Sequence, residues 1–245
     1  MNQLRVRVGR YGGEIELVHG VLPVRQVLGI GLNYAGHAKE QGQALPERPV
    51  VFSKSVLAVS VSGAPIRVPK ACQDRAQVDF EGELAVVIGE HPRDLPCRDV
   101  PRERAGEWVL GYAAANDVSA RWWQKQGSGG QFFRGKSFDT FCPLSAVRPA
   151  AGVPTPPGPG GLRITTRLNG VVMQDSTTAD LIFDVPTLVA ELSRGLTLAP
   201  GTVILTGTPS GVGMARSPQV FLNHGDEVEV TVEGVGTVRN AVVFE

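Results

Sequence analysis

Three acidic residues alternate with other residues in the segment VDFEGEL at 78–84. Successive side chains of a β-strand point to opposite faces, so an extended chain puts Asp79, Glu81 and Glu83 on one face, with neighbouring carboxylates about 6.7 Å apart. Each adjacent pair repels by roughly 2.5 kcal/mol at an effective dielectric constant of about 20, but by only about 0.6 kcal/mol in open water. The role of these acids therefore depends on whether their face is buried.

The next residues favour burial of this face. Residues 85–88 read AVVI, apolar on both faces, which is typical of a strand inside a sheet. Buried carboxylates need a cation to offset their repulsion, and their oxygens are the ligands that Mg²⁺, Mn²⁺ and Ca²⁺ prefer. A metal site is one interpretation of the segment. The other is an edge strand whose acidic face lies in water.

A further carboxylate follows a second apolar stretch. Residues 111–115 form a small, apolar strand candidate, and Asn116-Asp117 comes directly after it. Asp117 fits two compatible roles, as a metal ligand at a strand end and as the N-cap of a helix at 118–124. Its position strengthens the metal interpretation without deciding it.

Two other segments carry groups that can move or stabilise charge. His37 and Glu40 are three residues apart, so on a helix they share a face where the carboxylate can orient the imidazole. The alternative is an ordinary surface helix. Lys136 follows the glycine-rich stretch 127–130 and precedes a predicted strand, a position in which lysines are usually solvated. The segment GTPSGVG at 207–213 lacks the Lys-Ser/Thr ending of a phosphate loop, so we interpret it as a tight loop presenting N–H groups and Thr208 to a substrate carboxylate.

Many short strands must position these groups. Strands are expected at 27–30, 50–54, 66–68, 78–88, 109–115, 203–206, 227–232 and 237–244. Asn33 is the expected N-cap of a short helix carrying His37. Asn169-Gly170 predicts a β-hairpin between 163–168 and 171–175, and residues 187–192 have helical spacing. The prediction is a mainly β fold with few short helices (α+β), folded as a sandwich or barrel-like roll, with a small N-terminal hairpin over residues 1–20.

Composition excludes several classes of function. The 245 residues carry 24 basic and 24 acidic side chains, so the chain lacks the excess positive charge that nucleic acid or an anionic membrane surface would favour. The three cysteines include no CxxC pair, which fits neither a disulfide framework nor a zinc site. No apolar run reaches about 18 residues, and the first residues have no apolar signal region. A cytoplasmic protein without nucleic-acid or membrane partners is the expectation.

Six segments, taken in order, resemble the fumarylacetoacetate hydrolase (FAH) family. They are GLNYxxHxxE at 31–40, VDFEGELAVVIG at 78–89, GYxxANDVSAR at 111–121, RGKSFDTFCPL at 134–144, LNGxxMQDSTTADLIF at 168–183 and ILTGTPSGVG at 204–213. The resemblance runs from about Val27 to Val243. It implies a mixed β-strand roll with the site at its mouth, a catalytic domain over residues 21–245, and a homodimer.

The resemblance also implies a role for each site residue. Mg²⁺ or Mn²⁺, with Ca²⁺ as a weaker candidate, would be held by Glu81, Glu83 and Asp117, whereas Asp79 is not implied as a ligand. His37 and Glu40 resemble a general-base dyad on a lid segment that closes over the substrate. Lys136 would stabilise an enolate beside the metal, and Gln124 and Thr208 match positions that contact substrate in related members.

The implied activity is that of an isomerase or C–C bond hydrolase acting on 2-oxo or 2-hydroxy-enoic dicarboxylates through a metal-bound enolate, as in aromatic-acid catabolism. A 2-hydroxyhepta-2,4-diene-1,7-dioate isomerase is the first choice, and an oxaloacetate tautomerase or decarboxylase or an acylpyruvate hydrolase is the alternative. Leu32 stands where acylpyruvate-cleaving relatives often have Arg, which weakens the last of these. The alternative from another class is a catalytically inactive homologue that binds a small molecule.

Overall fold

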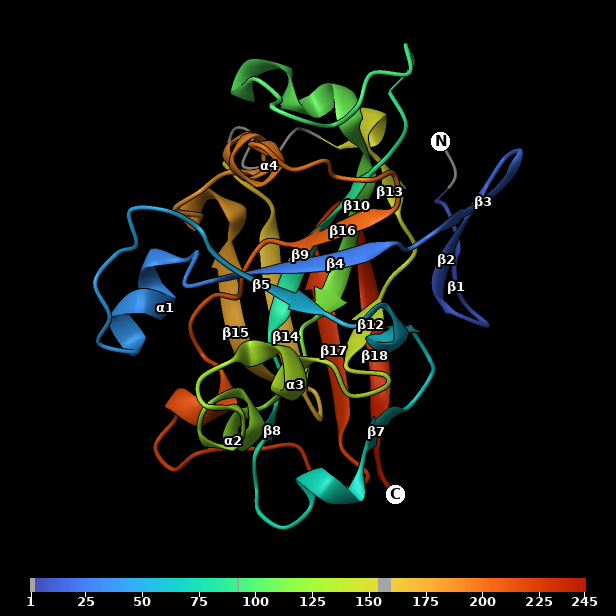
Figure 1. Ribbon diagram of the computed structural model, residues 1–245. Coiled ribbons are helices and arrows are strands. Elements are labelled where there is room, and N and C mark those ends of the chain that lie inside the picture. Colours follow the sequence, from blue (N-terminus) through green and yellow to red (C-terminus); the bar gives the residue numbers. More distant parts are fainter. Residues whose placement is uncertain (1–2, 92, 154–159) are drawn as a thin grey trace.

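Strands dominate this computed structural model, which describes residues 3–91, 93–153 and 160–245 (Figure 1). The helices are few and short, which confirms the predicted mainly β fold. In the described residues the α-helices are α1 (Ala35–Glu40), α2 (Arg121–Gln124), α3 (Phe132–Lys136) and α4 (Val185–Ser193). None of these is long and apolar enough to cross a membrane.

The largest sheet has the strand order β5-β4-β16-β9-β10-β12-β6, with β13 also paired to β10. Its strands are β4 (Gln26–Gly31), β5 (Val50–Lys54), β6 (Val59–Val61), β9 (Gly82–Ile88), β10 (Val109–Asn116), β12 (Cys142–Leu144), β13 (Arg148–Pro149) and β16 (Thr202–Leu205). All of β9 is buried. Leu84, Val86 and Ile88 pack in one core cluster and Ala85 and Val87 in another, so the strand is apolar on both faces, as its sequence predicts.

A second sheet has the order β15-β14-β17-β18-β7. Its strands are β7 (Ile66–Val68), β14 (Arg163–Leu168), β15 (Val171–Thr177), β17 (Glu227–Val232) and β18 (Gly236–Phe244). The predicted hairpin between β14 and β15 is confirmed. Asn169 and Gly170 have φ values of 51° and 80°, the two positive angles that a type I′ turn requires. Side chains from both sheets and from α4 share the largest core cluster.

Five further strands form two small sheets. At the N-terminus β1 (Val6–Gly9), β2 (Gly12–Leu17) and β3 (Gly20–Pro23) form an antiparallel sheet, which packs against the outer face of the largest sheet. β8 (Val78–Asp79) pairs with β11 (Ser119–Ala120). The predicted continuous strand over 78–88 is therefore wrong at its start, because Phe80 and Glu81 lie between β8 and β9.

The predicted capping role of Asn33 is also wrong. Tyr34 is the N-cap of α1. The buried Asn33 amide instead donates hydrogen bonds to the carbonyl oxygens of Phe183 and Thr206, and its Oδ1 accepts one from the Phe183 N–H. Asn33 thus fastens the start of the helix that carries His37 to two distant segments of the fold.

Candidate functional site

The end of the β9–β10 ladder brings the two acidic motifs together. Gly82 is paired with Asn116, and beyond this pair the Asp117 N–H donates to the carbonyl oxygen of Glu81 at 2.8 Å. The Asn116 side chain accepts a hydrogen bond from the Glu81 N–H. Because both chains are held here by backbone hydrogen bonds, Glu81 and Asp117 project from fixed positions.

Glu81, Glu83 and Asp117 form a buried group of carboxylates. Each offers an oxygen, and these three oxygens lie within 4.8 Å of one another. Lys136 Nζ contacts Glu81 at 2.6 Å and Asp117 at 2.5 Å, and Lys54 Nζ donates to the other oxygen of Asp117. Glu83 makes no ion pair with any described residue and accepts one hydrogen bond, from the Gly207 N–H at 2.7 Å.

The three acids experience different electrostatic environments. Burial raises the pKa of Glu81, but the neighbouring Lys136 and Arg121 outweigh burial and hold it below the ordinary value. Burial, together with repulsion from Asp117 and Glu81, raises the pKa of Glu83 well above the ordinary value. One carboxyl of the cluster therefore lacks a compensating positive charge.

The cluster fits a divalent metal ion. Carboxylate oxygens are suitable ligands for Mg²⁺ and Mn²⁺, and the uncompensated Glu83 provides the electrostatic demand for a cation. Three oxygens that already lie within 4.8 Å of one another converge on one region, as donors to a common ion must. Glu81, Glu83 and Asp117 are the residues that would hold the ion.

Asp79 has a separate, structural function. Arg121 donates to its Oδ2 at 2.9 Å and 2.7 Å, and the N–H groups of Gly213 and Met214 donate to the same carboxylate. Arg121 also contacts Glu81 at 2.5 Å. Asp79 thus joins the loop at 213–214 to Arg121. The expectation that Asp79 shares one face with Glu81 and Glu83 is wrong, because Asp79 does not belong to the carboxylate cluster.

The predicted His37/Glu40 pair is formed on α1. Glu40 Oε2 lies 3.1 Å from His37 Nδ1, and Gln41 Nε2 lies 2.8 Å from His37 Nε2. This arrangement fits the tautomer in which Nδ1 donates its proton to Glu40 and Nε2 accepts from the Gln41 amide. Glu40 also accepts a hydrogen bond from the Gly211 N–H, which joins α1 to the 207–213 loop.

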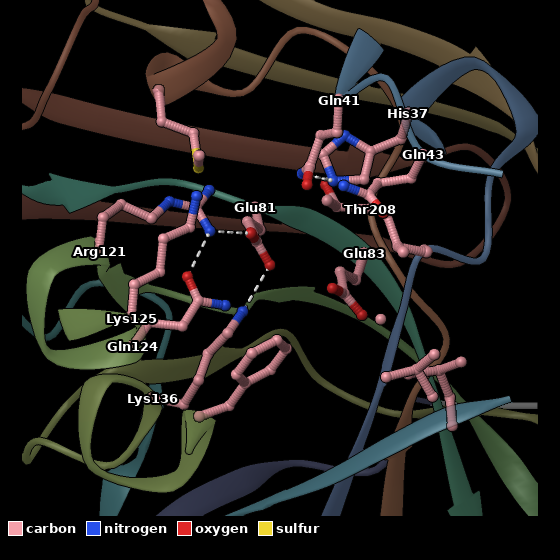
Figure 2. A pocket seen from close by; sticks show the side chains of 16 residues that line it. His37, Gln41, Gln43, Glu81, Glu83, Arg121, Gln124, Lys125, Lys136 and Thr208 are labelled. Atoms are coloured by element: carbon pink, nitrogen blue, oxygen red, sulfur yellow. Dashed lines mark hydrogen bonds and ion pairs between the residues drawn. The ribbon is translucent and has the colours of Figure 1, made fainter. Parts of the chain in front are cut away.

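A pocket of about 270 Å³ connects these groups (Figure 2). In Figure 2, His37, Gln41 and Gln43 lie on one side, Arg121, Gln124, Lys125 and Lys136 on the other, and Glu81 and Glu83 between them. Leu32, Val50, Phe132 and Met214 supply apolar lining. Of the residues predicted for the site, His37, Glu81, Glu83, Gln124, Lys136 and Thr208 line the pocket, whereas Glu40 and Asp117 contact it through His37 and Lys136.

The Thr208 hydroxyl is already engaged within the protein. It donates to the Gly82 carbonyl oxygen at 3.0 Å and accepts from Gln174 Nε2 at 2.7 Å. The 207–213 loop therefore directs one N–H toward Glu83 and one toward Glu40, which is how it borders the pocket. Contact between Thr208 or Gln124 and a substrate stays a prediction.

The family profile described as "Fumarylacetoacetate (FAA) hydrolase C-terminal" matches residues 26–243, almost the whole chain. The chain belongs to the fumarylacetoacetate hydrolase family. The mitochondrial oxaloacetate tautomerase of Xenopus laevis is 39% identical over 229 residues, which cover 94% of this chain and 69% of that protein. This membership confirms the resemblance carried by the six motifs.

Two solved structures are similar to this chain over nearly its whole length. Fumarylpyruvate hydrolase from Pseudomonas aeruginosa, in complex with Mn²⁺ and pyruvate, has a TM-score of 0.81 and 30% identity, with 98% of this chain and 99% of that chain covered. 2-Hydroxyhepta-2,4-diene-1,7-dioate isomerase from Mycobacterium marinum has a TM-score of 0.76 and 34% identity, with 99% and 87% covered. The fold of the FAH family is thus confirmed for this chain.

Sequence reasoning missed several residues of this FAH-family site, among them Arg121, Lys125, Lys54 and Gln41. Lys54 ends a strand whose other residues are largely exposed, and nothing in its spacing indicates that its ammonium group is buried against Asp117. Gln41, the C-cap of α1, has a usable signal, because a polar side chain four residues after His37 lies within its reach at helical spacing.

Proposed function

We propose that this FAH-family chain is a metal-dependent enzyme that moves a proton at C3 of short 2-oxo dicarboxylates, with oxaloacetate as the substrate to test first. The observation that carries the proposal is the position of His37, whose ring is held between Glu40 and Gln41 and lies across the pocket from the buried carboxylates. The similarity to an oxaloacetate tautomerase supports the same reaction. Keto–enol tautomerisation needs a base and positive charge near the 2-oxo oxygen, and both are available here.

A divalent ion held by Glu81, Glu83 and Asp117 would act as a Lewis acid that polarises the 2-oxo group and makes the C3 proton more acidic. Lys136 adds a fixed ammonium group on the same side of the pocket, where negative charge develops on the substrate. Its two carboxylate partners hold it in place, so little reorganisation is needed during the reaction.

His37 would remove the C3 proton through Nε2 in the keto-to-enol direction and return it in the reverse direction. Gln41 must first leave Nε2, because its amide occupies the lone pair that the proton would take. Glu40 faces Nδ1 and stabilises the imidazolium that forms. The predicted closure of α1 as a lid would place these steps away from water.

A second candidate reaction uses the same proton transfer. Similarity to the isomerase from Mycobacterium marinum favours double-bond isomerisation of a hydroxy-dienedioate, as in aromatic-acid catabolism. C–C hydrolysis needs in addition a water directed at a C4 carbonyl. We therefore place isomerisation second and hydrolysis third. Mg²⁺ or Mn²⁺ as the ion and a homodimer as the assembly are parts of the same proposal.

The test follows the absorbance of the oxaloacetate enol with Mg²⁺, with chelator, and in Glu81→Ala. We expect enzyme-accelerated decay with Mg²⁺ and none in the other two samples. Acceleration that persists in chelator would overturn the role of the metal. If the Mg²⁺-loaded protein accelerates the reaction of no 2-oxo acid tested, the alternative of a catalytically inactive binding homologue is favoured.

A further inference from the structure

The positively charged residues that line the pocket differ in how far their charge is already used. Lys136 is bound to Glu81 and Asp117. The Arg121 guanidinium donates to Asp79, Glu81 and Gln124 with all three of its nitrogens. Neither group can turn to a second anion without breaking contacts that hold the site together.

Lys125 is the exception among the described lining residues, because its ammonium group has no ion pair or hydrogen bond. Its backbone is nevertheless fixed. The N–H donates to the carbonyl oxygens of Arg121 and Trp122 at 3.1 Å and 3.2 Å, and its carbonyl oxygen accepts from the Gly130 N–H at 2.7 Å. Figure 2 shows its side chain running alongside Arg121 at the pocket.

The surroundings of Lys125 favour an incoming anion. Lys125 is exposed, but partial burial and then repulsion from Arg121 lower its pKa, and no carboxylate of the described residues compensates its charge. Lys125 also lines a neighbouring hollow together with Arg121 and Met214, which puts it on the rim between the two. The side chains of Leu32, Val50 and Phe132 elsewhere in the pocket offer an anion no partner.

We propose that Lys125 forms the subsite for the second carboxylate of a 2-oxo dicarboxylate. The inference rests on the proposed function, since it assumes that the 2-oxo carboxylate end lies at Glu81, Glu83 and Lys136. The distal carboxylate would then lie toward the rim of the pocket, where Lys125 is the described cation that has no ion-pair partner. Lys125 thereby makes the enzyme prefer diacids to monoacids of the same length.

The test compares two ligands that differ only at the distal end, 2-oxoglutarate with a carboxylate and 2-oxopentanoate with a methyl group. Their dissociation constants are measured by calorimetry on the Mg²⁺-loaded protein, and the same ligands are used as competitors of oxaloacetate turnover. The variants are Lys125→Met, Lys125→Arg and the control Lys70→Met, which removes an exposed lysine remote from the pocket. Thermal melting checks that each variant is folded.

We expect the wild type and Lys70→Met to bind the diacid about twofold to fivefold more tightly than the monoacid, as one exposed ion pair allows. Lys125→Met should lose this preference through weaker diacid binding alone, and Lys125→Arg should keep most of it. A diacid preference unchanged in Lys125→Met would overturn the subsite, as would its absence from the wild type. If the preference follows Lys125 but oxaloacetate is not turned over, the subsite stands and the proposed reaction fails.

Discussion

At the scale of single residues, the reactivity of the pocket depends on how neighbours fix His37. Glu40 faces Nδ1 and Gln41 faces Nε2, an arrangement that fits Nε2 as the base. We expect His37→Asn to lower kcat for oxaloacetate tautomerisation by about 10² to 10⁴, the usual contribution of a general base, and to leave Mg²⁺ binding unchanged. The enol absorbance assay measures the rate, and His19→Asn, which changes an exposed histidine, is the control. An unchanged kcat would remove His37 from the mechanism.

Glu83 gives a prediction about stability. Its folded-state pKa is raised, so its charged form is penalised and the metal-free protein loses stability as the pH rises from the unfolded pKa through the folded one. At pH 7, Glu83→Gln should therefore raise the melting temperature of metal-free protein by a few degrees. It should also remove the additional rise that Mg²⁺ or Mn²⁺ gives the wild type. A variant that melts below the metal-free wild type would contradict this account.

The sequence could predict the acidic residues of the site but not the positively charged side chains that neutralise them. The alternation of Asp79, Glu81 and Glu83 indicated repelling carboxylates, and the family motifs selected two of them together with Asp117. The cations come from other parts of the chain. Lys54 lies 63 residues before Asp117 and its pairing depends on the position of an edge strand, which local spacing does not encode.

At the scale of elements, the 207–213 loop joins α1 to the acid cluster. Gly211 has φ +100°, and a Cβ there would lie 2.2 Å from the Met173 carbonyl oxygen, so Gly211→Ala must displace the loop. We expect a loss of roughly 2 kcal/mol of stability or more, together with reduced kcat, because the Gly211 N–H also holds Glu40.

The matched control for that change is Gly234→Ala. Gly234 also has positive φ, at +73°, but a Cβ there meets no atom within 4 Å. This variant should cost about 1 kcal/mol and leave kcat unchanged. Urea unfolding measures the loss of stability in both variants, and the tautomerase assay measures kcat. Equal losses in the two variants would show that the positive φ angle alone, and not the contact with Met173, causes the effect.

A surface cluster gives a pH-dependent prediction. Hydrogen bonds from Arg104 and then His91 lower the pKa of Glu107 from 4.5 to about 2. The His91 contact ties the 3-10 helix at Arg102–Trp108 to a residue three positions after β9. Because the folded pKa is depressed, this stabilisation is present above pH 4.5 and is lost as the pH falls toward 2. At pH 7, Glu107→Gln should unfold at a lower midpoint concentration of urea than the wild type. The difference between the two midpoints should become smaller at pH 3. Glu103→Gln, on the same turn, should show no such narrowing.

Local signals predicted the elements whose cause is local. The Asn169-Gly170 turn formed because both residues tolerate positive φ, and the helix at 187–192 formed as α4, with Asp184 as its N-cap and Pro186 in its first turn. The Asn33 prediction failed for the opposite reason. Its capping preference is outweighed by hydrogen bonds to residues 150 or more positions away.

At the scale of the whole molecule, the site exists only because segments far apart in the sequence meet at one pocket. The acids come from the β9–β10 ladder, the base from α1, Lys136 from α3, and the bordering loop from the segment after β16. Their separation in sequence explains why the family resemblance, rather than residue spacing, predicted the complete set. The homodimer and the boundary at residue 20 stay predictions.

The central claim is that a divalent ion on Glu81, Glu83 and Asp117 and a base at His37 together exchange the C3 proton of a 2-oxo acid. The most direct measurement is deuterium incorporation at C3 of 2-oxoglutarate in D₂O, followed by NMR. We predict rapid incorporation with the Mg²⁺-loaded wild type, and only the background rate after chelation or in His37→Asn. Incorporation that continues undiminished in the chelated protein, or none in the loaded wild type, would contradict the account.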